Sequence, residues 1–307
     1  PKGYYLTSYN VILDENGCLK SYSQVDKDAV VSEGKLWHAY VKIAKESPWF
    51  NDQTYIDVFN KEAVSYFVEV THQKYFEKIG EDFGKSVPSI FTDEPQMAGK
   101  FAFATPFDEK DATLSYTDDM DDTYKAKYGV SLLSIVPEIL WELPDKKVSQ
   151  HRYNYHNHLS ERFTESFPDQ ISDWCEKHNL MMTGHYMSER LYSQTLALSE
   201  AMRLYRSMQM PGIDILCDQK EFTTAKQAAS VARQQGREGV TCELYGVTEW
   251  DAEFKTYKLQ GDWLAALGIT HRCHHLSFMS MEGESKRDWP ASIGYQSPWY
   301  PVYHMVE

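Results

Sequence analysis

The chain has 307 residues, with 31 Lys or Arg against 45 Asp or Glu, which gives a formal net charge of -14. This acidic balance excludes a nucleic-acid partner, because a phosphate-binding face needs clustered Lys and Arg. The length allows one large domain with a sizeable core, and a single α/β barrel of this size is ordinary.

The cysteines and the apolar stretches exclude further classes. Five cysteines are scattered without CxxC spacing, so neither a zinc site nor a disulfide framework is indicated. No stretch approaches the roughly 18 apolar residues that a membrane span requires, and the first residues form no signal peptide. We therefore expect no membrane partner. Because the chain begins on proline, it could be a mature form or a cut piece, and its compartment stays open.

The first third of the chain predicts a β-rich start. Residues 4–13 and 36–43 alternate as strands do, and a shorter strand is expected at 54–58. Asn60 then caps a helix whose apolar positions follow the 3.6-residue period. This helix leads into a strand at 89–95.

Residues 96–150 break the pattern repeatedly with glycines, prolines and an acidic run at 118–122. The acidic run lacks the spacing of a calcium-binding EF-hand loop and predicts a solvated helix start instead. We interpret the whole stretch as an irregular insertion.

Helix-to-strand units repeat from there to the end of the chain. The expected pairs are 153–179 with 180–186, 198–208 with 212–217, 225–235 with 239–246, and 259–267 with 269–275. Such repetition predicts parallel strands in an α/β fold, which we expect to be a TIM-type (β/α)8 barrel, truncated or irregular over its first strands. We expect residues 1–307 to form one catalytic domain, with the insertion 96–150 at the barrel mouth.

Two of the expected strands end in a glutamate. Glu94 ends an apolar run stopped by Pro95, and Glu243 ends a second run just before a turn glycine. A protonated acid paired with an ionised one is what glycosidic bond cleavage needs. We predict Glu94 as general acid, its pKa raised by the neighbouring charge of Asp93, and Glu243 as base or nucleophile. The sequence leaves inversion and retention both open, and either glutamate could instead be a surface or ion-paired acid.

Other strand ends and the following loops supply candidates for binding a carbohydrate. The residues predicted to bind substrate are Asp93, His185, Tyr186, Tyr245, Trp250, His275, Glu282 and Trp299. Histidine and tyrosine could hydrogen-bond sugar hydroxyls, and tryptophan could stack on a pyranose ring, although ordinary packing explains each of them equally well. Glu282 and Glu284 could contact substrate or bind calcium.

Three motifs carry a family resemblance: Ile-Phe-Thr-Asp-Glu-Pro (90–95), Glu-Leu-Tyr-Gly-Val-Thr (243–248) and Ser-Met-Glu-Gly-Glu-Ser-Lys-Arg-Asp-Trp-Pro-Ala-Ser (280–292). Together they resemble the central barrel of glycoside hydrolase family 106 and its uncharacterised relatives, from about Trp37 to the end. The resemblance implies α-L-rhamnosidase activity with inversion, assistance from calcium, and Glu94 and Glu243 as the catalytic pair. It also implies accessory β-sandwich domains, which we expect to be missing from this chain together with the first two barrel strands.

Two rival classes stay open. A metal-dependent barrel hydrolase would place His185, Asp214, His274 and His275 around zinc or another transition metal. A non-catalytic carbohydrate-binding barrel would keep the aromatic residues and tolerate the loss of either glutamate.

Overall fold

The chain divides into two compact units in the computed structural model. The described residues are 3–97, 99–216, 221–278, 280, 282–283, 293–295 and 297–306. The first unit comprises Pro1–Val64 and Met97–Ser166, and the second comprises Ser65–Gln96 and Phe167–Glu307. Among the described residues, no helix has both the length and the apolar character needed to cross a membrane.

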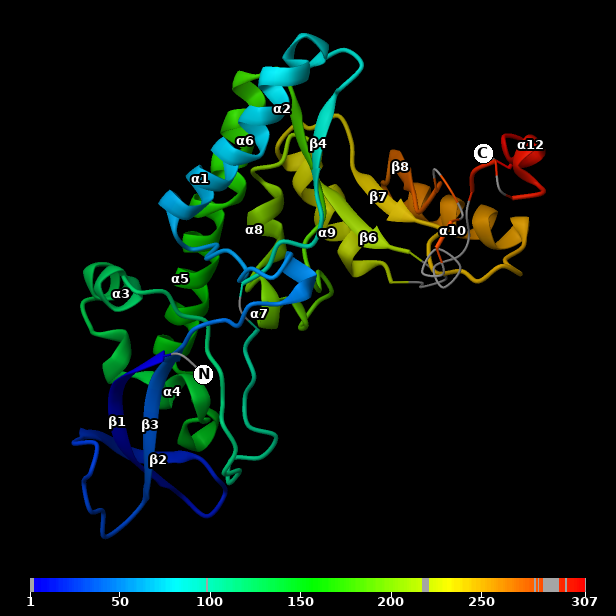
Figure 1. Cartoon of the computed structure of the whole chain (residues 1–307). Helices are drawn as coiled ribbons and strands as arrows, with labels where there is room; N and C mark the ends of the chain where they lie inside the picture. The colour runs from blue at the N-terminus through cyan, green and yellow to red at the C-terminus, as the bar shows by residue number, and fades with distance from the viewer. Residues whose placement is uncertain are drawn as a thin grey trace. The chain divides into compact units, whose positions relative to one another are not determined.

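The first unit contains an antiparallel sheet with strand order β2-β1-β3, drawn in blue in Figure 1. Its strands are β1 (Gly3–Leu13), β2 (Leu19–Val25) and β3 (Lys35–Lys42). The turn after β1 forms because the Asp14 carboxylate accepts the backbone N–H groups of Asn16 and Cys18, at 2.9 and 2.8 Å, and Gly17 adopts a φ of 82°. The predicted strands at 4–13 and 36–43 are confirmed. The strand expected at 54–58 is wrong, and β2 was not predicted.

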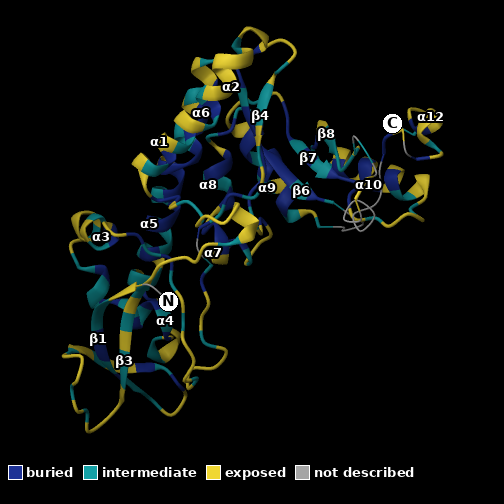
Figure 2. Cartoon of the chain, viewed as in Figure 1, coloured by how far each residue is buried: buried dark blue, intermediate teal, exposed yellow. Residues whose placement is uncertain are grey.

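Helices from the stretch 96–166 belong to the same unit. They are α3 (Met120–Tyr128), α4 (Val136–Leu140) and α5 (Gln150–Ser166), with short 3-10 turns at Leu132–Ser134 and Pro144–Lys146. A further 3-10 turn of this unit, at Pro48–Phe50, follows β3. The core joins Tyr9, Val11 and Leu19 of the sheet to Trp141, each no more than 4% exposed. Figure 2 colours the chain by burial. Residues 96–150 therefore supply part of the core that covers the antiparallel sheet.

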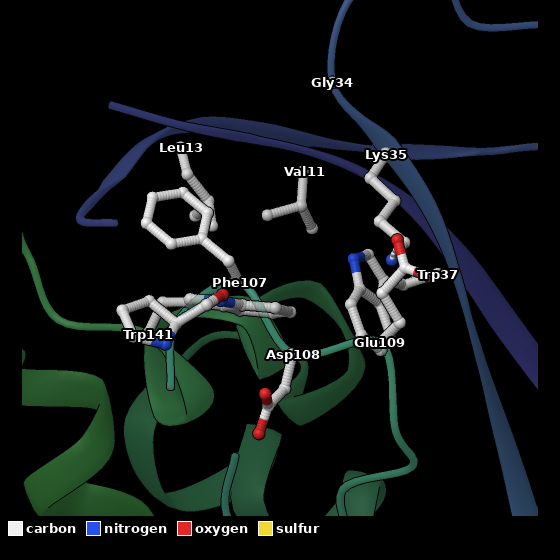
Figure 3. Close-up of a pocket in the computed structure, with 10 residues that line it drawn as sticks. Val11, Leu13, Gly34, Lys35, Trp37, Phe107, Asp108, Glu109 and Trp141 are labelled. Carbon is white, nitrogen blue, oxygen red and sulfur yellow. Dashed lines mark hydrogen bonds and ion pairs between the residues drawn. The ribbon is translucent and has the colours of Figure 1, made fainter. Parts of the chain in front are cut away.

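A pocket of about 350 Å³ lies beside this core (Figure 3). Its lining residues are Val11, Leu13, Gly34, Lys35, Trp37, Pro106, Phe107, Asp108, Glu109 and Trp141. The Lys35 ammonium and the Glu109 carboxylate form a 3.0 Å ion pair there, while the Trp141 indole donates to the carbonyl of Pro106 at 3.0 Å. None of the predicted catalytic residues lines this pocket.

The second unit is built on parallel strands. They are β4 (Ser89–Thr92), β5 (Met181–Gly184), β6 (Gly212–Ile215), β7 (Thr241–Leu244) and β8 (His271–His274). β4 pairs with β5, and β7 pairs with β6 on one side and β8 on the other. The remaining helices of the chain are α1 (Lys61–Val70), α2 (His72–Ile79), α6 (Pro168–Lys177), α7 (Gln194–Ala197), α8 (Ala201–Tyr205), α9 (Thr223–Gln234), α10 (Phe254–Leu267) and α12 (Tyr300–Tyr303), with a 3-10 turn at Gly80–Asp82.

β5 and β6 lie side by side although no strand ladder joins them. The backbone N–H of Met210 donates to the carbonyl of Met182 at 3.2 Å, so the chain enters β6 next to β5. A side chain on Gly212 would place its Cβ only 2.1 Å from the carbonyl oxygen of Gly184, so the close approach requires glycine. We call this contact the β5–β6 junction. It brings the two parallel sheets together.

The predicted (β/α)8 barrel is wrong. The described residues form sheets of three, two and three strands, and none of these sheets closes on itself. The repeating helix and strand units predicted parallel strands correctly, but closure also requires one continuous cyclic ladder. Instead, the first three strands follow one another without an intervening helix and pair antiparallel in a separate sheet.

Local capping signals explain several helix ends. The Asn60 side chain accepts the N–H groups of Glu62 and Ala63 at 3.0 and 3.1 Å, which confirms the predicted cap of α1. The helix predicted at 153–179 is instead two helices, because Pro168 lacks the N–H that an uninterrupted helix would use and begins α6.

Replacing Trp141 by alanine tests the core of the first unit. Trp141 is 2% exposed and packs against the rings of Trp37 and Phe103 at centroid distances of 5.4 and 4.9 Å. We expect Trp141→Ala to lower the free energy of unfolding by about 3–5 kcal/mol, since it leaves a cavity. Urea unfolding followed by near-UV circular dichroism measures this change.

The matched control is Trp49→Ala, because 87% of the Trp49 surface is exposed. We expect this control to change stability by no more than about 0.5 kcal/mol. Equal unfolding midpoints for the two variants would contradict the assignment of Trp141 to the core.

Candidate functional site

Charged side chains gather where the parallel strands end. Because β4 runs parallel to β5, and β6 and β8 run parallel to β7, the carboxyl ends of the strands lie at one edge of each sheet. We call the group found there the strand-end cluster; its members are Asp93, Glu94, His185, Asp214, Glu243 and His275. Ligand atoms of Asp93, His185 and Glu243 lie within 4.8 Å of one another, as do those of Glu94, His185 and Asp214.

His185 is the centre of this cluster. Its side chain is 2% exposed, and its Nε2 lies 2.8 Å from Glu243 Oε2 and 3.6 Å from Asp93 Oδ1. The backbone fixes its place, because its N–H donates to the carbonyl of Thr92 at 3.1 Å and its carbonyl accepts the N–H of Glu94 at 3.2 Å. These bonds extend the pairing of β4 and β5 one step beyond the strands.

The environment of His185 favours its charged form. Burial opposes the charge, but the hydrogen bond to Glu243 and the negative charges of Glu189, Asp214 and Glu243 outweigh burial and raise the pKa to about 9. The ring is therefore an imidazolium at neutral pH, and its Nε2–H donates to the Glu243 carboxylate.

Glu94 follows β4 in a strained backbone conformation. Its φ is 49°, in the left-handed region that non-glycine residues seldom adopt and that costs about 1–3 kcal/mol. The side chain is half-buried. Burial raises the pKa of Glu94, and the charges of Asp93 and Glu243 raise it further, while His185 acts in the opposite direction. Glu94 therefore holds its proton more tightly than an ordinary glutamate does.

Glu243 lies on β7, one residue before the strand ends, and its pKa shifts in the opposite direction. Its side chain is 19% exposed, and its Oε1 lies 3.9 Å from Nε2 of His275. Burial favours the neutral acid, but the hydrogen bond from His185 and the charges of His185 and His275 outweigh burial and lower the pKa of Glu243. The two predicted catalytic glutamates thus differ in the direction of their pKa shifts.

Two acidic residues of the site were absent from the predicted set of site residues. Asp214 lies on β6, and burial, with the charges of Glu243, Glu94 and Asp93, raises its pKa to about 6. Its place near the end of a predicted strand could have identified it, although we considered it only as a metal ligand. Glu189 is 4% exposed and lies in the segment after β5. No periodicity or motif marks Glu189, because its burial comes from tertiary contacts alone.

Two predicted substrate-binding tyrosines are packed into the interior. Tyr186 and Tyr245 are each 1% exposed. The ring of Tyr186 lies 5.8 Å from that of Tyr205, and the ring of Tyr245 lies 5.1 Å from that of Tyr257. The structure therefore places these rings against α8 and α10 and not in the strand-end cluster.

The remaining predicted binding residues lie in later loops. Trp250 is 47% exposed in the segment after β7, and Trp299 packs its ring against Phe254 and Tyr257 at 5.6 and 5.8 Å. Glu282 is exposed, and its backbone N–H donates to the Ser280 hydroxyl at 3.0 Å. Glu284 lies outside the described residues, so the calcium site expected with Glu282 remains a prediction.

The cluster itself does not fit calcium. Calcium takes six to eight oxygen ligands, whereas the central group here is the imidazole of His185. A transition metal accepts imidazole nitrogen, but His185 Nε2 already forms a 2.8 Å hydrogen bond with Glu243. The donor set is therefore that of a hydrogen-bonded charge cluster.

Comparisons with known proteins find a likeness among solved structures. No family model matches the sequence, and a search of curated proteins finds no match. Among solved structures, the chain is similar to a rhamnosidase from Novosphingobium sp. PP1Y, with a TM-score of 0.61 and 16% sequence identity. The likeness covers 82% of this chain but only 24% of the rhamnosidase chain. It shows that the fold of this chain is similar to part of that rhamnosidase, and it does not show membership of family 106.

Replacing Glu243 by glutamine tests the charge balance of the cluster. We expect Glu243→Gln to lower the pKa of His185, because the ring loses its charged hydrogen-bond partner. Titration of histidine ring protons by NMR, with the resonance assigned through a His185→Gln variant, measures this shift. Since the pKa of His185 rises from 6.5 to about 9 on folding, the stability that its charge contributes is present below pH 6.5 and lost as the pH rises through about 9.

Asp93→Asn is the matched control for this titration. The Asp93 side chain is 77% exposed, and its carboxylate lies 3.6 Å from the ring nitrogen. Water screens such an exposed charge, so we expect a smaller fall in the pKa of His185. Equal shifts in the two variants would contradict the central role of the bond between His185 and Glu243.

Proposed function

We propose that this chain carries the active site of a glycoside hydrolase acting on an α-L-rhamnoside-like substrate. The observation that carries the proposal is the convergence of Glu94 and Glu243 on His185, with the pKa of Glu94 raised and that of Glu243 lowered. Two carboxyl groups whose environments move their pKa values apart supply an acid and a base at one pH. The similarity to a rhamnosidase fold supports the reaction class.

In the proposed reaction, Glu94 is the general acid. As the bond between the anomeric carbon and the glycosidic oxygen breaks, the Glu94 proton moves to the leaving oxygen. In one route, Glu243 takes a proton from a water molecule while the oxygen of that water adds to the anomeric carbon. In the other, the Glu243 carboxylate attacks the anomeric carbon directly, and water then hydrolyses the glycosyl-enzyme intermediate. The family resemblance favours the first route, with inversion. The anomeric configuration of the sugar when it is first released distinguishes inversion from retention.

The other members of the cluster set the charges around this pair. The His185 imidazolium keeps Glu243 ionised through the 2.8 Å hydrogen bond. Asp93, with 77% of its side chain exposed, is available to accept a hydrogen bond from a sugar hydroxyl. The preference for rhamnose rests on the motif resemblance and on the rhamnosidase fold. We also propose that the whole protein carries accessory β-sandwich domains, as the family resemblance implies.

Paired glutamine variants test the assignment of acid and base. With p-nitrophenyl α-L-rhamnoside, whose leaving group needs little protonation, we expect Glu243→Gln to lower kcat by about 100-fold or more. Glu94→Gln should lose much less with this substrate, and about 100-fold or more with an alkyl rhamnoside, whose leaving oxygen must be protonated. Steady-state kinetics on both substrates measure the difference.

Glu176→Gln is the control, since Glu176 is exposed on α6, away from the strand ends. Full activity in both Glu94→Gln and Glu243→Gln would show that the assignment is wrong. If the unmodified chain bound rhamnosides in calorimetry but hydrolysed neither substrate, a non-catalytic carbohydrate-binding function would replace the proposal.

A further inference from the structure

Glu189 lies buried behind the strand-end cluster, and the proposed reaction does not use it directly. Its Oε1 accepts the backbone N–H of Tyr186 at 2.8 Å, and its Oε2 accepts that of Asp214 at 3.2 Å. Tyr186 follows β5 and Asp214 lies on β6, so one carboxylate joins the two strands near their carboxyl ends. Hydrogen bonds from N–H groups to a carboxylate are stronger than those between neutral groups.

We propose that Glu189 is a positioning residue, whose carboxylate bridges the β5–β6 junction and so fixes His185 and Asp214 at the active site. This inference rests on the proposed function for its catalytic consequence. The residues that form the bridge all lie in the described part of the second unit.

The topology gives this bridge its importance. β5 and β6 have no strand ladder between them, so the regular hydrogen bonds that align neighbouring strands are replaced by separate contacts. Near the amino ends, the N–H of Met210 donates to the carbonyl of Met182 at 3.2 Å. Near the carboxyl ends, where the chemistry is proposed, the two bonds to Glu189 join the strands.

The backbone of Glu189 is held from the opposite side. The side-chain amide of Gln227, on α9, donates to the Glu189 carbonyl at 3.3 Å, and its oxygen accepts from the amide of Gln194 at 3.1 Å. The Gln194 side chain also accepts the N–H of Ala201 at 2.7 Å. This network of amides fixes the segment that carries Glu189.

The charge of Glu189 also acts on His185. A buried carboxylate requires a compensating positive charge. Burial raises the pKa of Glu189, while the charge of His185 and the hydrogen bonds from Tyr186 and Asp214 oppose this rise, and the resulting pKa is about 7. Glu189 in turn favours the imidazolium form of His185. The charged groups that act on His185 are Asp93 and Glu94 after β4, Glu189 after β5, Asp214 on β6 and Glu243 on β7.

Glutamine cannot reproduce this arrangement. Its side chain has one oxygen and one NH₂ group, so the NH₂ group would face a backbone N–H, and two donors cannot bond. Aspartate keeps the charge but is one methylene shorter, so it cannot span both N–H groups. Glu189→Gln therefore removes both the bridge and the charge, whereas Glu189→Asp removes the bridge and keeps the charge.

The experiment compares Glu189→Gln and Glu189→Asp with the control Glu176→Gln. In the absence of substrate, we expect Glu189→Gln to lower the pKa of His185 in the NMR titration, and Glu189→Asp to lower it less. With p-nitrophenyl α-L-rhamnoside, both variants should lower kcat by about 10- to 100-fold, the loss expected of a misplaced catalytic group. KM should stay near that of the unmodified chain, because Glu189 does not contact the substrate.

The His185 titration supplies a readout that general loss of structure would not move in a fixed direction. Glu189→Gln removes a negative charge that favours the imidazolium, so the titration of His185 should move to lower pH. An unchanged His185 titration in folded Glu189→Gln would overturn the proposal. If this variant does not fold, Glu189→Asp decides: a wild-type kcat overturns the bridging role, and a tenfold or greater loss supports it.

The titration also separates this inference from the proposed function. If the unmodified chain hydrolyses no rhamnoside, the NMR shift still tests the link between Glu189 and His185. If Glu94→Gln and Glu243→Gln behave as expected while Glu189→Gln leaves His185 unchanged, the inference fails and the proposed function stands.

Discussion

The buried hydrogen bond between His185 and Glu243 is the interaction on which the rest of the site depends. It joins the end of β5 to the end of β7 across a distance of 2.8 Å, and it balances a positive charge that is 2% exposed. Without that charge, the acidic groups of the cluster would repel one another and bind protons more tightly. The imidazolium therefore allows one glutamate to stay ionised next to another that keeps its proton.

The sequence allowed several of these residues to be placed together, although it did not predict the fold around them. Glu94, His185, Glu243 and His275 could be grouped because each lies at the end of an expected strand, and such strands alternated with helical periods. That reasoning requires only that the strands be parallel, which they are. Barrel closure depends on which strands pair over long separations, and the pattern within one strand carries no such information.

Side-chain direction marks a second limit of sequence reasoning. Tyr186 and Tyr245 each stand one or two residues from a cluster member, yet their rings point into the interior. Tyr186 adjoins His185, and neighbouring residues of an extended chain face opposite sides. Tyr245 lies two residues beyond Glu243, but its φ of 70° departs from the extended conformation, so the alternation does not hold there. Glu189 illustrates the reverse case, because a residue without any local pattern becomes important through two backbone N–H groups from different segments.

The left-handed backbone at Glu94 has a consequence for how this position can change. Glycine would adopt a φ of 49° without strain, and asparagine would tolerate it better than glutamate does. Both substitutions would remove the carboxyl group that the proposed chemistry requires. Stability and activity are therefore opposed at a single residue, as is common where function holds a backbone in an unfavourable conformation. Selection for stability alone would move position 94 away from glutamate, and a glutamate retained there would be a sign of selection for catalysis.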